Sequence, residues 1–184
     1  MSDAANILNA IQQDERYSDL LDWGTPRRGH PEGTVRAHIE ELERNLTALS
    51  HKLTIAERDR LRLLIHTHDT FKAKATRGSA ITDPRSHASL GRQFLAEFCD
   101  DSDLLNMVQW HDEPYALWQK QRRSQTVDEE RLQGLIDRID DWDLFLAFQI
   151  IDNGTEGKSR EPLQWFFPMI AQCVETRFSV VDLL

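Results

Sequence analysis

The stretch Thr54-Ile-Ala-Glu-Arg-Asp-Arg-Leu-Arg-Leu-Leu-Ile-His-Thr-His-Asp69 predicts a helix with a well-defined start and an unusual end. Thr54 and Glu57 have the spacing of a capping box, in which each side chain accepts a hydrogen bond from a free backbone N–H of the first turn. His68 follows Leu61 and Leu64 by seven and four residues, so it shares their face. The helix therefore carries an inward-facing histidine, followed by Asp69, into the core.

Helical spacing of apolar residues recurs along the rest of the chain, whereas strand-like alternation is hard to find. Glycine (8) and proline (6) are sparse among the 184 residues. This pattern predicts an all-α fold, and the length suits a single domain over residues 1–184, a helical bundle. The expected helices span residues 4–23, 34–50, 54–69, 86–98, 102–111, 115–123, 126–139 (opened by a second capping box, Thr126 to Glu129), 142–152 and 162–178.

Composition and charge argue against several classes of protein. A formal net charge of −9, with no stripe of lysine or arginine to offset it, argues against general nucleic-acid binding. No apolar run approaches the roughly 20 residues that span a bilayer, so no membrane association is expected. Residues 1–15 lack the basic start and apolar stretch of a secretory signal, which predicts a cytoplasmic protein. Nothing in the sequence points to an oligomeric state. A small phosphorylated ligand stays possible because a bound metal inverts the local field.

Five of the expected helices each place one potential metal ligand on an apolar face. His38, for example, lies three residues after Val35 and four before Leu42. A single histidine in such a place is ordinary, but burying several imidazoles and two carboxylates without partners costs several kcal/mol per unpaired charge. Neutral imidazole and carboxylate are the usual ligands of catalytic divalent ions. The pattern therefore predicts a metal site built from His38, His68, Asp69, His87, His111 and Asp152.

The order of these residues resembles the HD-domain superfamily of metal-dependent phosphohydrolases, over about residues 29–158. The most specific segment is Ile65-His-Thr-His-Asp-Thr-Phe-Lys72, which resembles the HD-x-x-K signature at the end of an apolar helix. The segment His87-Ala-Ser-Leu-Gly-Arg-Gln-Phe-Leu95 resembles the second-metal segment of the superfamily, in which a histidine opens a helix with a glycine four residues on. The resemblance implies a single HD domain.

The resemblance also implies a ligand set for two divalent metal ions, drawn from Mn, Mg, Co, Ni or Fe. The first ion would be held by His38, His68, Asp69 and Asp152. Asp69 would bridge to a second ion, held by His87 and His111. Simpler HD nucleotidases have only the first four ligands and one metal. Many dinuclear relatives have a His-His pair where this chain has His111-Asp112, and the glycine-tyrosine-proline motif of the cyclic dinucleotide phosphodiesterases is absent.

By the same resemblance, the expected activity is hydrolysis of a phosphomonoester or phosphodiester, with a nucleotide among the candidate substrates. A metal-bridging hydroxide would be the nucleophile, and Asp69 would be catalytic as the bridge. Lys72 is expected to bind and neutralise a substrate phosphate, and His30, in the turn Gly29-His-Pro-Glu-Gly33, is expected to line the substrate site. Two alternatives stay open: an HD-fold mixed-valent di-iron oxygenase with the same ligands, and a non-catalytic metal-binding sensor module.

Overall fold

The computed structural model describes residues 3–27 and 29–184, and within this part it is helical with no named strand. The all-α prediction is therefore confirmed. The α-helices are α1 (Asp3–Gln13), α2 (Glu15–Ser18), α3 (Val35–Leu49), α4 (Ile55–Thr67), α5 (His87–Leu95), α6 (Ser102–Trp110), α7 (Glu113–Ser124), α8 (Glu129–Ile136), α9 (Trp142–Asn153) and α10 (Glu161–Ile170). Short 3₁₀ turns are η1 (Ser50–Lys52), η2 (Thr70–Ala73) and η3 (Val180–Asp182).

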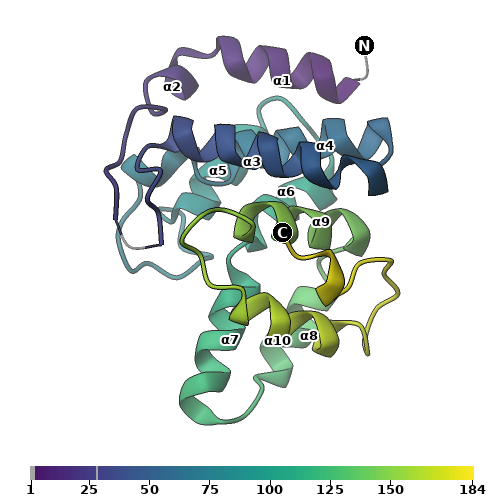
Figure 1. The fold of residues 1–184 in the computed structure, drawn as a ribbon. Coiled ribbons are helices and arrows are strands. Elements are labelled where there is room, and N and C mark those ends of the chain that lie inside the picture. The colour runs from purple at the N-terminus through teal and green to yellow at the C-terminus, as the bar shows by residue number, and fades with distance from the viewer. Residues whose placement is uncertain (1–2, 28) are drawn as a thin grey trace.

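Helix α4 is the central element of the bundle. It contacts α1, α3, α5, α6 and α9, and every residue from Leu63 to Thr67 is buried. Its first half carries the charged residues from Glu57 to Arg62, whereas a segment that is buried on all sides, such as residues 63–67, is stable only when other helices surround it. In Figure 1, α1 lies beyond α3 and α4 at one end of the molecule, and α7, α8 and α10 form the other end. The C-terminal end of α4 is thus placed in the interior, where α3, α5, α6 and α9 can each approach it.

The predicted helix boundaries hold for most elements and fail at three places. The capping box of Thr54 and Glu57 is present, with the Thr54 amide donating to Glu57 Oε2 at 2.7 Å. The first helix breaks early because Asp14 accepts a hydrogen bond from the Arg16 amide and starts the short α2. The second capping box is wrong: the Thr126 amide donates to Ser124 Oγ, and Asp128 caps α8 instead.

The last helix also ends before its predicted limit at residue 178. It ends at Ile170, and the chain that follows turns back toward the first turn of α9. The Thr176 hydroxyl and the Arg177 amide both donate to Asp143 Oδ1, at 2.7 and 2.9 Å. These tertiary hydrogen bonds satisfy backbone and side-chain groups outside a helix. Sequence periodicity cannot detect such a termination.

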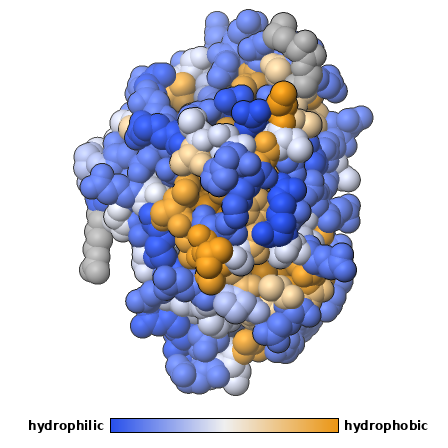
Figure 2. Space-filling view, turned by 45° about the vertical axis from the view of Figure 1, so that its right-hand side comes forward, coloured by the Kyte–Doolittle hydropathy of each residue, from blue (hydrophilic) through white to orange (hydrophobic). Residues whose placement is uncertain are grey.

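Large apolar side chains are mainly inside the bundle. Figure 2 shows a face on which hydrophilic residues predominate, with apolar residues exposed in several smaller areas between them. The large hydrophobic residues with substantial exposure in the described part are Trp23, Ile55, Tyr115, Val180, Val181 and Leu184. Within the described residues, no helix has the length and apolar character needed to cross a membrane.

Gly91 allows α5 to lie directly against the end of α4. A Cβ atom at this position would lie 2.7 Å from the Thr67 carbonyl oxygen and 3.3 Å from Val108 Cγ1. The obstructing oxygen belongs to the backbone, so it cannot move aside without displacing the end of α4. His87, at the start of α5, depends on this close approach for its distance from Asp69.

We predict that Gly91→Ala lowers the free energy of unfolding by about 1–3 kcal/mol, because the added methyl group overpacks a rigid contact. Gly134→Ala is the matched control, since its Cβ would meet only the flexible end of Arg138 and alanine has the higher helix propensity. Urea unfolding of both variants tests this. Equal or greater stability of Gly91→Ala than of the wild type would contradict the prediction.

Candidate metal centre

A first cluster of side chains forms where α3, α4 and α9 meet. His38 lies in the first turns of α3, His68 directly follows α4, and Asp152 lies in the last turn of α9. His38 Nε2 is 3.1 Å from Asp152 Oδ1 and 3.7 Å from Asp69 Oδ2. His68 Nε2 is 3.6 Å from Asp152 Oδ1 and 3.4 Å from Asp69 Oδ2. The predicted first ligand set therefore converges, although 114 positions separate His38 from Asp152.

A second cluster lies on the other side of the Asp69 carboxylate. His87 Nε2 is 3.6 Å and His111 Nε2 is 3.7 Å from Asp69 Oδ1, and the two imidazole nitrogens are 3.2 Å apart. His87 is the first residue of α5, and His111 directly follows α6. The two oxygens of one buried carboxylate thus face different pairs of histidines, Oδ2 toward the first cluster and Oδ1 toward the second.

The hydrogen bonds of the imidazoles suit metal binding. His68 Nδ1 lies 3.1 Å from the Leu64 carbonyl oxygen, and His111 Nδ1 lies 2.7 Å from that of Val108. Each Nδ1 therefore carries the proton that it donates to the backbone, and the lone pair of Nε2 faces the cluster. A backbone acceptor for the second ring nitrogen is the usual arrangement for a metal-ligating histidine.

Three buried polar atoms of the cluster residues have no hydrogen-bond partner among the described residues, namely His38 Nδ1, His68 Nε2 and Asp69 Oδ1. His38 Nδ1 faces Glu32, outside the first cluster. Leaving such an atom unpaired costs about 1–3 kcal/mol. Donor atoms at about 2.0–2.2 Å from a common ion lie about 3–3.5 Å from one another in tetrahedral or octahedral geometry, close to the separations in both clusters. The residues therefore fit divalent cations, and bound ions would satisfy His68 Nε2 and Asp69 Oδ1.

Glu32 supports His38 from outside the cluster. Its Oε1 atom lies 3.1 Å from His38 Nδ1 and 3.0 Å from His30 Nδ1. A carboxylate at the far nitrogen of a ligating histidine orients the ring and makes it more basic. The turn that contains Glu32 is evident in the sequence, but no role for this residue is predicted from it. The only signal was its place two residues after His30, which by itself predicts no contact with His38.

Asp112 is a second residue without a predicted role. Its Oδ2 atom is 3.2 Å from His87 Nε2, and its Oδ1 atom is 3.7 Å from His111 Nε2. The carboxylate is about half exposed, with a side-chain exposure of 52%. Neighbouring imidazoles hold its pKa below the ordinary value, although burial acts in the opposite direction. Asp112 directly follows His111, so its carboxylate adds one potential ligand to the second cluster.

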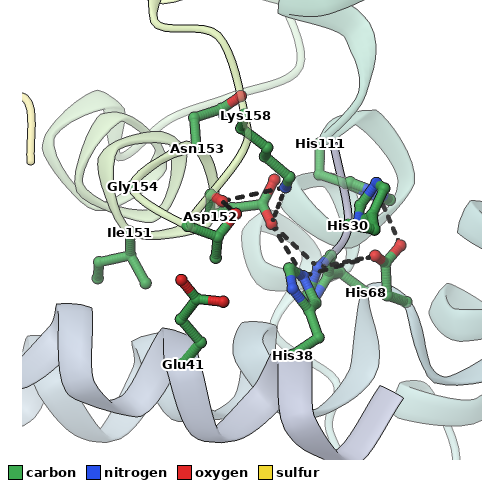
Figure 3. A network of polar contacts seen from close by, with 12 residues as sticks. His30, His38, Glu41, His68, His111, Ile151, Asp152, Asn153, Gly154 and Lys158 are labelled. Carbon is green, nitrogen blue, oxygen red and sulfur yellow. Dashed lines mark hydrogen bonds and ion pairs between the residues drawn. The ribbon is translucent and has the colours of Figure 1, made fainter. Parts of the chain in front are cut away.

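Two lysines bring positive charge to the clusters. Lys72 forms an ion pair with Asp69 Oδ2, and Lys158 Nζ lies 2.8 Å from Asp152 Oδ1 and 3.0 Å from the Asp152 carbonyl oxygen. Figure 3 shows Asp152 between Lys158 and the imidazoles of His38 and His68. Lys72 was predicted at the site. Lys158 was not, because it lies in the loop between α9 and α10, where no helical periodicity indicates its direction.

The charges of the first cluster are strongly coupled. Burial opposes ionisation of Asp69 and of Asp152, yet the nearby lysines and imidazoles hold the pKa of both carboxyl groups well below the usual range. Burial also favours the neutral form of His38, but its contacts with Asp152 and Glu32 outweigh burial and raise its pKa to about 9. A protonated His38 beside the carboxylates of Asp69 and Asp152 neutralises part of their negative charge, as a bound metal ion would.

A cavity of about 520 Å³ opens beside both clusters. Its polar lining includes Asp69, His111, Asp112 and Asp152, together with the two lysines, and its apolar lining includes Tyr115, Trp118, Pro162 and Leu163. His30 also lines this cavity, with Nδ1 directed to Glu32. His66 lies away from the clusters, where its Nδ1 is 2.5 Å from the Tyr17 hydroxyl, and His51 is exposed.

Comparison with protein-family models, with curated proteins and with solved structures finds no match to this chain. The function is therefore inferred from the geometry of the clusters and the cavity, together with the motif resemblance.

We predict that chelator-treated protein becomes less stable as the pH rises from about 6.5 to about 9. His38 has a raised pKa in the folded state, so the folded protein binds more protons than the unfolded chain over this range. Its contribution is complete below the ordinary pKa of 6.5 and is lost as the pH passes about 9. Urea unfolding at several pH values measures the slope.

His38→Gln should reduce this slope because glutamine does not titrate. His68, whose pKa is also raised, despite burial, by the neighbouring Asp69 and Asp152, should supply the remainder. His51→Gln is the control. His51 lies in η1 and is exposed, and its Nδ1 contacts the carbonyl oxygen of Ala48 in α3. A wild-type profile that is flat or that rises with pH would contradict the raised pKa.

Proposed function

We propose that this protein is a metal-dependent phosphohydrolase that acts on a small phosphomonoester or phosphodiester. The observation that carries the proposal is the placement of Asp69, whose two carboxylate oxygens face separate histidine pairs. Such a carboxylate suits a bridge between two divalent ions. The resemblance of the motifs to HD-domain phosphohydrolases agrees with this geometry.

The proposed ligands follow from the distances. His38, His68, Asp152 and Asp69 Oδ2 would hold the first ion, and His87, His111 and Asp69 Oδ1 would hold the second. Asp112 is close enough to His87 to join the second set. This mixture of imidazole and carboxylate suits Mn²⁺, Co²⁺, Ni²⁺ or Fe²⁺, and the carboxylates also suit Mg²⁺.

Two ions held in this way supply activation of water near neutral pH and stabilisation of charge on a phosphoryl group. The chain itself supplies the rest of the site. Lys72 and Lys158 line the cavity with ammonium groups that attract the oxygens of a dianionic phosphate. Glu32 keeps His38 in the orientation that directs Nε2 inward. The bundle excludes solvent from His68, which is 1% exposed.

The di-iron oxygenase has the same candidate ligands and is the main rival. The two ammonium groups in the cavity favour an anionic substrate, and their charge is well matched to phosphate. A non-catalytic sensor would also bind metal, but it would give no turnover with any substrate. Both rivals are therefore separated from the proposal by turnover measurements under defined metal and oxygen conditions.

We predict two Mn²⁺ ions per chain by equilibrium dialysis and elemental analysis. His87→Ala should reduce the number to one, and Asp69→Ala should weaken both sites because it removes the shared carboxylate. Asp112→Asn should lower the affinity for the second ion by about 10- to 100-fold, which is the effect of losing a supporting group in other metal sites. Asp100→Asn, at an exposed position, is the control. Two ions retained in His87→Ala would contradict the assignment.

We predict phosphate release from a panel of phosphate esters and nucleotides in an anaerobic chamber, with Mn²⁺ as the sole added metal. His68→Ala should abolish the activity. Lys72→Ala should lower kcat by about 10²- to 10³-fold if its ammonium group acts as one oxyanion donor. Lys74→Ala, two positions along the same loop and exposed, should have little effect.

If no compound of the panel releases phosphate and the protein shows iron-dependent oxygen uptake in air, the hydrolase proposal is overturned in favour of the oxygenase. Metal binding without either reaction would favour the sensor.

A further inference from the structure

The cavity beside the metal clusters has an aromatic side that the hydrolytic reaction does not require. Tyr115 and Trp118 occupy positions i and i+3 of α7, and their ring centroids are 5.6 Å apart with an interplanar angle of 34°. Both line the cavity, and Tyr115 is 46% exposed. Both also lie outside the hydrophobic core of the bundle. Their apolar surface is therefore available to a ligand.

Neighbouring groups hold these rings in place. The Arg122 guanidinium lies over the Trp118 ring, 5.0 Å from its centroid, which is the geometry of a cation–π contact. Helix α7 packs against α10, whose first turn adds Pro162 and Leu163 to the same cavity. A preformed apolar surface binds a ligand with a smaller loss of conformational entropy than a flexible one.

The aromatic pair begins one helical turn from the second cluster. Asp112, which contacts His87, directly precedes α7, and Tyr115 and Trp118 follow it by three and six residues. At about 1.5 Å of rise per residue, the backbone positions that carry the rings lie about 4.5 and 9 Å farther along the helix axis. A phosphate group near the clusters and lysines would therefore leave its organic group beside the rings.

We propose that Tyr115 and Trp118 bind the organic group of the substrate and select phosphate esters that carry a planar aromatic ring. This inference rests on the proposed function, since it takes the phosphate to lie at the metal clusters. Stacking of a planar ring on aromatic side chains is favourable for any π face and needs no specific hydrogen bonds. The preferred class then includes aryl-containing phosphates and nucleoside phosphates, and excludes purely aliphatic esters of similar size.

The test compares benzyl phosphate with cyclohexylmethyl phosphate, which have similar size and similar alcohol leaving groups but differ in the flatness of the ring. The wild-type protein should show the lower KM for benzyl phosphate. Trp118→Leu should raise this KM by about 5- to 150-fold, the range that corresponds to the loss of one stacking contact. Its kcat, and its KM for cyclohexylmethyl phosphate, should change little. Trp118→Phe should restore part of the preference.

A second readout does not depend on turnover. Calorimetric titration with benzylphosphonate and cyclohexylmethylphosphonate, which are not hydrolysed, should give the same order of affinity in the wild type and the loss of that order in Trp118→Leu. Tyr115→Leu supplies an independent variant if Trp118→Leu fails to fold, as judged by thermal unfolding. Hydrolysis of both esters with equal KM would overturn the selectivity and leave the proposed function intact. Selective binding of benzylphosphonate without any hydrolysis would support the aromatic site and overturn the proposed function.

Discussion

The fold is organised around the burial of one carboxylate, that of Asp69, at the end of the central helix α4. An isolated carboxylate in the core is expensive, so positive or hydrogen-bonding groups must surround it. Four imidazoles and Lys72 do so, and they come from different elements that all approach the end of α4. The close contact at Gly91 and the support of Glu32 behind His38 serve the same arrangement. The helix packing around the end of α4 therefore also determines which charged groups surround the Asp69 carboxylate.

The sequence predicted the parts of the site that lie on regular helices. His38, His68, His87, His111 and Asp152 each occupy an apolar helical face or a helix end, and periodicity is sufficient to identify them. The sequence did not predict a role for three residues of the site. Glu32 lies in a turn, Asp112 at a helix junction and Lys158 in a loop, where residue spacing does not indicate the direction of a side chain. The same limit explains the helix boundaries. Asp14 ends the first helix by accepting a hydrogen bond from the Arg16 amide. Asp143 holds the chain after α10 by accepting hydrogen bonds from Thr176 and Arg177.

In the proposed substrate site, the cavity would combine two kinds of recognition that respond differently to salt. Lys72 and Lys158 provide local positive charge in a chain with a net charge of −9, so attraction of an anion is confined to the immediate surroundings of the clusters. The aromatic surface on α7 is insensitive to salt. A ligand that uses both would keep part of its affinity at high ionic strength, and a bare anion would not.

The shared carboxylate of Asp69 also couples whatever binds on its two sides. A cation at Oδ2 would fix the orientation of the carboxylate for a cation at Oδ1, and at the same time it would withdraw negative charge and repel a second cation. By thermodynamic reciprocity, the change in affinity that the first occupant causes at the second position equals the reverse effect. The sign of that coupling free energy depends on whether preorganisation or repulsion is larger. If both positions bind a cation as proposed, filling them would accordingly be cooperative or anticooperative, and two independent binding isotherms would not describe it.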